Sequence, residues 1–174
     1  MEFQQLLVDD LRIRPFQPTD IQDYWAILSD PLNEQMGGQP RPQNMEQAKQ
    51  WLQNAINAQT LAIERVSEAK VVGLIEQQPR FKGQPPLIDE TEIQLGFLMN
   101  ATYRRLGIMY HSLNRLFTYY KEQHLQAVWA GVFPENQASI KLLTKLGFQY
   151  RYTVDLSHFA LDSHNKEAYY ELTL

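Results

Sequence analysis

The stretch 91–150 constrains the fold most, because it changes periodicity several times over a short length. Residues 92–99 partly alternate apolar and polar side chains without helix punctuation, and 126–132 form a second such segment, so we expect two strands. Between them, the apolar residues of 108–123 recur at helical spacing. A further helix is expected over 136–147, where an asparagine can cap the start and a glycine can end it.

The link between the first of these strands and its helix is a short basic turn, Tyr103-Arg104-Arg105-Leu106-Gly107. The first backbone N–H groups of a helix have no intrahelical partners, and the helix dipole adds partial positive charge there. A glycine lets a phosphate approach the backbone, and Arg104 and Arg105 add full charges. The turn is therefore a candidate anion site. A plain strand-to-helix connection with two solvated arginines is the alternative.

Four short motifs carry a resemblance to a known family. They are Gly96-Phe97, the run Tyr103–Met109, Asn136-Gln137-Ala138-Ser139 and Lys145-Leu146-Gly147-Phe148. In this pattern the chain resembles the GNAT N-acetyltransferases, and within them the RimJ/RimL-like type that acetylates the N-termini of ribosomal proteins. The chain departs from the family pattern at Arg105, where a glycine is usual, and at Met109, where a small residue is usual. Tyr110-His111 also stands where the family commonly has Thr-Glu.

The resemblance covers nearly the whole chain and implies an α/β (α+β) fold, the GNAT acyl-CoA N-acyltransferase fold. We expect a single domain over 1–174, with a mixed, mostly antiparallel sheet and helices on both faces. In this family the sheet is splayed between its fourth and fifth strands and the cofactor enters the gap. Those strands correspond here to 92–99 and 126–132.

The resemblance also implies direct acetyl transfer from acetyl-CoA, as cosubstrate, to a primary amine, without a metal. Ser139 matches the serine suggested as the general acid, which would protonate the departing thiolate. A backbone N–H within 97–99 would hold the carbonyl oxygen as it gains charge. The residues expected to bind acetyl-CoA are Phe97, Leu98, Met99, Arg104, Arg105, Leu106, Gly107, Ile108, Met109 and Asn136.

The acceptor amine must lose a proton, and Glu92 is the expected base because it lies on a strand beside the implied cleft. Asp89 and Glu90 are the runners-up. A solvated carboxylate at a strand edge is the alternative for Glu92, just as an ordinary first-turn serine is the alternative for Ser139. Asn136 is expected to bind the pantetheine arm; a role as helix cap alone is the alternative, and the two roles are compatible.

The composition limits the class of protein. A chain of 174 residues with 44% hydrophobic and 21% charged residues is globular and fits one domain with a full core. The absence of cysteine excludes disulfides, thiolate metal sites and a cysteine nucleophile, and it is compatible with the cytoplasm, the expected compartment. The four histidines show no metal spacing. We expect neither a secretory signal nor a membrane-spanning segment.

Charge is unevenly distributed along the chain. The net charge of −4 argues against general nucleic-acid binding. Residues 1–92 hold eight Lys and Arg against fourteen Asp and Glu, whereas residues 93–151 hold seven against two. The basic segment suits a polyphosphate cofactor and the acidic one a cationic partner.

We expect a peptide N-terminus as the acceptor. A small-molecule amine, or a CoA-binding module without catalysis, is the alternative. The oligomeric state, monomer or homodimer, stays open.

The remaining elements follow from local patterns. Helices are expected after a capping box at Thr19 with Gln22 and after a cap at Asn44 with Gln47. Two segments rich in proline and glycine, 30–44 and 78–89, are expected to be loops, as is a turn at 162–165. The other expected strands cover 11–15, 60–66, 70–77, 148–159 and 167–174.

Overall fold

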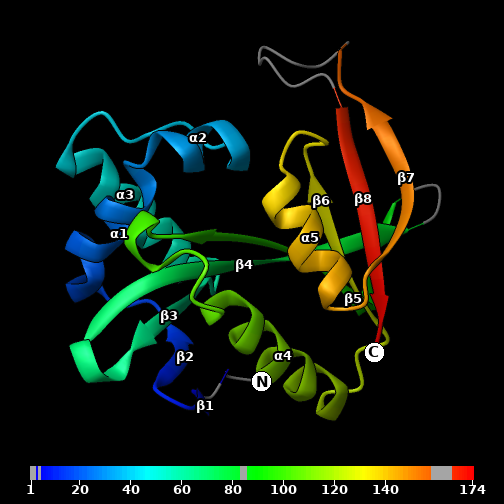
Figure 1. The fold of residues 1–174 in the computed structure, drawn as a ribbon, viewed down its shortest axis with the longest axis horizontal. Helices are drawn as coiled ribbons and strands as arrows, with labels where there is room; N and C mark the ends of the chain where they lie inside the picture. The colour runs from blue at the N-terminus through cyan, green and yellow to red at the C-terminus, as the bar shows by residue number, and fades with distance from the viewer. Residues whose placement is uncertain (1–2, 4, 83–85, 158–165) are drawn as a thin grey trace. The chain divides into compact units, whose positions relative to one another are not determined.

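The computed structural model describes residue 3 and residues 5–82, 86–157 and 166–174 (Figure 1). The chain divides into two compact units, and each combines two separate segments. The first unit holds Met1–Gln77 and Gly96–Leu116, and the second holds Gln78–Leu95 and Phe117–Leu174. Three elements contribute residues to both units: β4 (Lys70–Lys82), β5 (Leu87–Met99) and α4 (Ile108–Glu122).

The strands form one eight-stranded sheet with the order β1-β2-β3-β4-β5-β6-β8-β7. The pairing of β5 with β6 is parallel, and the registered pairs β1–β2, β2–β3, β3–β4, β6–β8 and β7–β8 are antiparallel. The predicted mixed, mostly antiparallel sheet is therefore confirmed. The other strands are β1 (Leu6–Val8), β2 (Leu11–Pro15), β3 (Leu61–Arg65), β6 (Ala127–Val132), β7 (Gln149–Asp155) and β8 (Lys166–Thr173).

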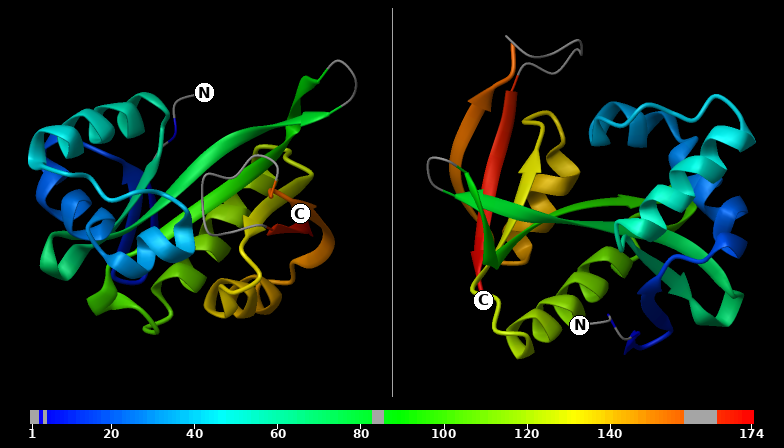
Figure 2. Two further views of the ribbon diagram at one scale, coloured as in Figure 1. Left: turned by 90° about the horizontal axis from the view of Figure 1, so that it is seen from above. Right: turned by 180° about the vertical axis from the view of Figure 1, so that it is seen from behind.

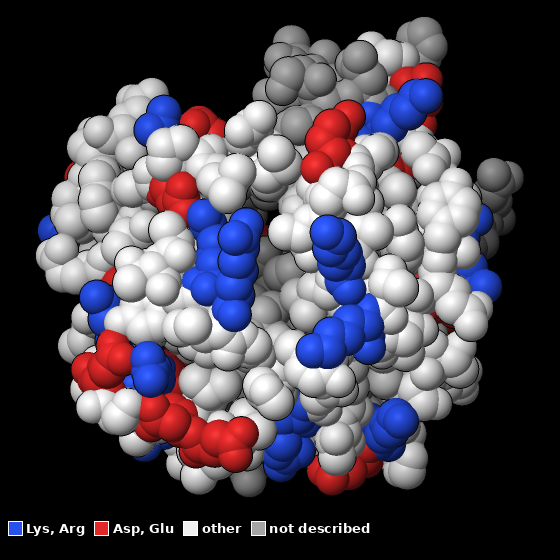
Figure 3. Space-filling model, viewed as in Figure 1, with Lys and Arg blue, Asp and Glu red and all other residues white. Residues whose placement is uncertain are grey.

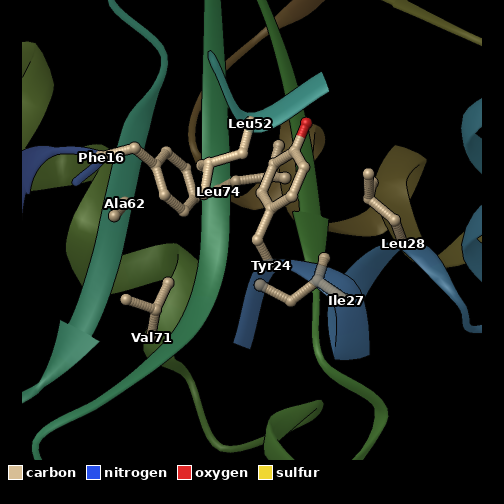
Figure 4. Close-up of a cluster of buried hydrophobic side chains, with 8 residues drawn as sticks. All are labelled: Phe16, Tyr24, Ile27, Leu28, Leu52, Ala62, Val71 and Leu74. Atoms are coloured by element: carbon tan, nitrogen blue, oxygen red, sulfur yellow. The ribbon is translucent and has the colours of Figure 1, made fainter. Parts of the chain in front are cut away.

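The core of the first unit lies where helices α1 (Ile21–Leu28) and α3 (Met45–Asn57) cover the sheet. Figure 4 shows Phe16 and Tyr24 beside Leu74 of β4. The two aromatic rings pack edge to face, with their centroids 5.3 Å apart. The apolar stripe that predicted α3 places Leu52 in this cluster, with Trp51, Ala55 and Ile56 packed against it. The helix begins where predicted, because the Asn44 side chain accepts from the amide of Gln47 at 2.9 Å.

Two predictions in the first unit are wrong. The segment 30–44 is not all loop, since it contains helix α2 (Pro31–Gly37). Asp30 caps this helix by accepting from the amide of Leu32, and Gly38 ends it with a left-handed φ of 70°. The capping box is also not at Thr19 and Gln22: a 3-10 turn precedes α1, and the amide of Gln17 donates to Asp20 at 2.8 Å.

The predicted loop 78–89 is also wrong, because most of it belongs to strands. β4 continues to Lys82 and β5 begins at Leu87, and in both views of Figure 2 these strands run side by side. Their outer ends carry exposed Phe81, Leu87 and Ile88, so no buried face marks them as strands in the sequence. The outer ends of β4 and β5 keep their strand conformation because the two strands pair with each other.

The second unit places β6 between β5 and β8. β6 is buried along nearly its whole length, whereas β7 at the sheet edge is mostly exposed. Helix α5 (Gln137–Lys145) buries Leu143, and after it Gly147 adopts a left-handed φ of 92°. The end of the predicted strand 148–159 and the predicted turn 162–165 lie outside the described residues. No helix within the part of the chain that the structure describes is long and apolar enough to cross a membrane.

Candidate active site

The final residues of β5 present a strand edge beyond the pairing with β6. The registered pairs of β5 and β6 are Glu92 with Ala127, Ile93 with Val128 and Gln94 with Trp129, and β5 then continues to Met99. The amide of Asn100 donates to the Val72 carbonyl of β4 at 2.9 Å. Because backbone groups alternate along a strand, the amides of Phe97 and Met99 point to the edge opposite β4. This edge is where the sequence predicts the donor for the carbonyl oxygen.

The basic turn joins β5 to α4, and two of its residues have left-handed backbone. Arg105 has a φ of 63° and Gly107 a φ of 78°. The Gly107 carbonyl accepts from the amide of His111, so Gly107 stands at the start of α4. Ile108 and Met109 are buried, so their side chains do not form part of the exposed surface of the turn. Arg105 and Leu106 are exposed.

Arg104 is held inside the first unit. Its guanidinium donates to the Asp30 carboxylate, to the Asn33 side chain at 2.9 Å and to the Met99 carbonyl at 3.3 Å. Asn33 itself donates to the carbonyls of Ile27 and Met99, at 2.8 and 3.0 Å. This set of contacts ties α2 to the end of β5 and to the turn. It also neutralises Arg104, which leaves Arg105 as the exposed cation of the turn.

In the second unit, Asn136 and Ser139 open helix α5. The Asn136 side chain accepts from the amide of Ser139 at 3.1 Å, so Asn136 caps the helix as predicted. Ser139 lies in the first turn and is partly exposed. Lys141 and Lys145 of the same helix are exposed, and Figure 3 shows basic side chains over α5. The helix thus presents a polar, positively charged surface at its start and along one side.

Glu92 belongs to a contact network in the second unit. Its carboxylate accepts from the indole N–H of Trp129 at 2.7 Å. The guanidinium of Arg80 lies 4.3 Å from the centre of the Trp129 ring and donates to Gln94 and Tyr152. The runner-up Asp89 accepts from the amide and hydroxyl of Thr91, so this carboxylate is engaged locally. Glu92 is only partly buried, and its position on β5 agrees with the prediction.

The sequence missed a third carboxylate, Glu76 of β4, which lies in the first unit. Its carboxylate accepts from the side chain of Gln39 at 2.7 Å, and it lies beside Gly96 of β5. The strand pattern gave no signal for it, because a glutamate at the end of a predicted strand is ordinary. Asn33 was missed because α2 was not predicted. Among the described residues, no group of three or more His, Asp or Glu side chains is placed to hold a metal ion.

Comparison with known families identifies the class. A sequence model of the acetyltransferase (GNAT) domain matches residues 10–149, so the chain belongs to this family. It is an N-acetyltransferase that uses acetyl-CoA and acts on an amine acceptor. No protein of curated function matches the sequence.

Solved structures share the fold over nearly the full chain. An acetyltransferase (GNAT family) from Bacillus anthracis is 19% identical with a TM-score of 0.85, and 98% of each chain is covered. The ribosomal L7/L12 α-N-protein acetyltransferase RimL, in complex with coenzyme A, is 14% identical with a TM-score of 0.79 and 98% coverage of each chain. An acetyltransferase from Salmonella typhimurium that modifies the N-terminal serine of ribosomal protein L7/L12 is 15% identical with a TM-score of 0.78 and 96% coverage of each chain. At these identities the likeness concerns the fold.

Proposed function

We propose that this acetyltransferase transfers the acetyl group of acetyl-CoA to a peptide or protein N-terminal α-amine. The observation that carries the proposal is the shared fold, over nearly the full length, with enzymes described as modifying the N-termini of ribosomal proteins. Their low identity leaves the acceptor to experiment. The two compact units act together as one acetyltransferase domain in this proposal, since β4 and β5 run through both.

The chemistry of the amine supports an α-amine over a lysine side chain. A free α-amine has a pKa of about 7.7–8.0 and a lysine side chain about 10.4. Near pH 7 roughly a tenth of the α-amine is therefore already neutral and nucleophilic, against less than ~0.1% of the lysine. The candidate bases of this enzyme are single carboxylates. Deprotonation of an α-amine requires a weaker base than deprotonation of a lysine, so the α-amine suits these carboxylates better.

The turn before α4 fits the diphosphate of acetyl-CoA. Gly107 has no side chain to obstruct an approach, and a Cβ there would meet the His111 ring at 3.4 Å. Arg105 and the amides of the first turn of α4 would hold the diphosphate. The Phe97 and Met99 amides would hold the acetyl carbonyl oxygen, a contact that can contribute about 10²–10³ in rate.

Three residues of the second unit have proposed roles in the same reaction. Asn136 would bind the pantetheine arm in addition to capping α5. Ser139 would give a proton to the thiolate as it leaves. Glu92 would accept the amine proton, and the Trp129 indole would orient it. Replacement of Glu92 by Gln keeps an oxygen acceptor for the indole and removes the charge.

A competition between two peptides tests the acceptor. One peptide has a free N-terminus and no lysine, and the other has a blocked N-terminus and one lysine. Mass spectrometry after incubation with acetyl-CoA should locate the acetyl group on the free N-terminus. Acetylation confined to the lysine peptide, or found only on a small polyamine, would overturn the proposed acceptor. Binding of acetyl-CoA without thiol release for any amine would favour the alternative of a binding module.

The cellular setting follows from the same proposal. An enzyme that modifies newly made proteins belongs in the cytoplasm, which also suits a chain without cysteine. The acidic N-terminal part of the chain would attract a cationic acceptor.

A further inference from the structure

Glu76 lies directly beside the backbone of Gly96. A Cβ added to Gly96 would lie 3.2 Å from Oε2 of Glu76, so the space above Gly96 is filled by this carboxylate. Gly96 comes one residue before Phe97, whose amide points to the strand edge of the proposed site. The carboxylate is therefore within the same unit and on the same strand pair as the residues proposed to hold the acetyl carbonyl.

Glu76 is partly buried and has no cationic partner among the described residues. The hydrogen bond from Gln39 satisfies Oε1, and Oε2 is left toward Gly96. A partly desolvated carboxylate without a counter-ion is costly, and a cation is the ligand that offsets the cost best. Most carboxylates of the first unit are paired instead, as Asp20 and Glu64 are with Arg14.

Glu76 interacts with Gln39 and with Tyr24, which come from other elements of the first unit. Gln39 follows the end of α2, and this end lies close to β5, since a Cβ on Gly37 would meet the Leu98 side chain at 2.8 Å. The charge of Glu76 acts on the Tyr24 hydroxyl of α1. Burial first, and the charge of Glu76 second, raise the pKa of Tyr24 to about 12, so Tyr24 stays neutral at physiological pH.

We infer that Glu76 binds the ammonium group of the acceptor, with Gln39 orienting the carboxylate, and so selects amines that arrive charged. This inference rests on the proposed function and adds the residue that recognises the acceptor. It differs from the role proposed for Glu92, which belongs to the second unit and has the Trp129 indole as a partner. The acceptor would meet Glu76 as a cation before it is deprotonated for attack.

The test compares two acceptors in the unaltered enzyme and in Glu76→Gln. One acceptor is a short peptide with a free N-terminus, which is largely protonated at pH 7. The other is aminoacetonitrile, a weakly basic amine that is neutral at this pH. Loss of a charge-assisted contact should lower kcat/KM for the peptide roughly tenfold to hundredfold, mainly through KM. The loss for aminoacetonitrile should be much smaller. The affinity for acetyl-CoA, measured by calorimetry, should not change.

Three further variants sharpen the result. Gln39→Ala should change the KM for the peptide in the same direction by less, because the carboxylate keeps its charge and loses its orientation. Glu92→Gln should lower kcat for both acceptors. Glu122→Gln, at an exposed carboxylate at the end of α4, should leave all constants unchanged. Each variant's thermal unfolding confirms that it folds.

The outcomes that would overturn the inference are distinct from one another. Equal losses for the two acceptors in Glu76→Gln, or an unchanged KM for the peptide, would show that Glu76 does not recognise the charge. A failure of the unaltered enzyme to acetylate any amine would overturn the proposed function as well. Transfer to amines with no effect of Glu76→Gln would overturn this inference alone.

Discussion

Arg105 and Gly107 share an unusual backbone conformation in the turn before α4, and only one of them is a glycine. Left-handed backbone costs a non-glycine residue roughly 1–2 kcal/mol. The chain thus accepts strain at Arg105 and keeps an exposed guanidinium beside the start of a helix. Such strain is tolerable where the charge serves a ligand.

Substitutions at the two residues should both weaken acetyl-CoA binding, but through opposite changes in backbone strain. Gly107→Glu should weaken acetyl-CoA binding at least tenfold, because it adds strain and a negative charge at the proposed diphosphate site. Arg105→Gly should raise the melting temperature by a few degrees, because it removes strain, while acetyl-CoA affinity falls. Calorimetry at two salt concentrations measures the acetyl-CoA affinity of both variants. The salt dependence of this affinity should be smaller in Arg105→Gly than in the unaltered enzyme. An affinity unaffected by Gly107→Glu would remove the turn from the site.

Ser139 gives a prediction about the rate alone. If it protonates the departing thiolate, Ser139→Ala should lower kcat while acetyl-CoA affinity stays within about twofold, because the proton is needed only in the transition state. Ala138→Ser, one position earlier on the same helix, is a matched control that should leave kcat unchanged. The measurement is thiol release under saturating substrates. A Ser139→Ala enzyme with unaltered kcat would leave the serine a structural role, provided that chemistry limits the rate.

For single residues, the sequence predicts those roles that depend on neighbours close in the chain. Asn136 caps α5 and Gly107 stands at the start of α4, because caps and turns depend on neighbours a few positions away. Glu76 and Asn33 were missed because their partners, Gln39, Gly96 and Met99, are distant in sequence. Nothing in the order of residues indicates which strands and loops will bring such groups together.

At the scale of elements, Arg14 of β2 joins the start of α1 to β3. Its guanidinium binds Asp20 with two hydrogen bonds of 2.8 and 2.9 Å and Glu64 with one of 2.6 Å. The hydrogen bonds that Arg14 donates to Asp20 raise the pKa of Arg14 above its usual value, against the opposing effect of burial. All three side chains are largely buried, so the cation is needed to offset two carboxylates.

Removal of the Arg14 guanidinium should destabilise the fold. Arg14→Ala should lower the free energy of unfolding by about 3–5 kcal/mol at pH 7, because it leaves the buried Asp20 without a cation and Glu64 with only the longer contact to Arg12 at 3.7 Å. The folded variant should then bind protons more readily than the unfolded chain, so its stability should rise as pH falls. The loss should therefore be smaller near pH 4. Urea unfolding at both pH values measures this.

The exposed pair of Arg151 with Glu171 supplies the comparison for this prediction. Arg151→Ala should cost less than about 1 kcal/mol, because solvent screens the pair. An equal decrease in the free energy of unfolding in Arg14→Ala and Arg151→Ala would contradict the special role of the buried cation.

Helix α2 and the outer ends of β4 and β5 mark the limit of prediction for elements. The longer helices were predicted because each buries a periodic stripe. α2 is too short to show a period, and its signals are the capping Asp30 and the ending Gly38. The strand ends carry polar residues, one proline and exposed apolar side chains without a regular alternation, so only the pairing of the two strands reveals them.

At the scale of the whole molecule, both compact units are discontinuous in sequence. A chain that ends at Gln77 would lack the second segment of the first unit, and the buried side chains of β4 such as Val72 and Ile75 would lose cover. We expect this fragment to unfold without cooperativity in far-UV circular dichroism. The fragment 1–116 contains all residues of the first unit and should show more native secondary structure. Cooperative unfolding of the fragment 1–77 would contradict the division.

The order in which the chain leaves the ribosome adds a constraint. Synthesis proceeds from the N-terminus, so the first unit cannot be complete until Leu116 has emerged, although Gln77 emerged long before. During that interval the apolar strands β3 and β4 are present without β5 and α4. A chaperone that binds exposed apolar segments would meet the nascent chain in that interval.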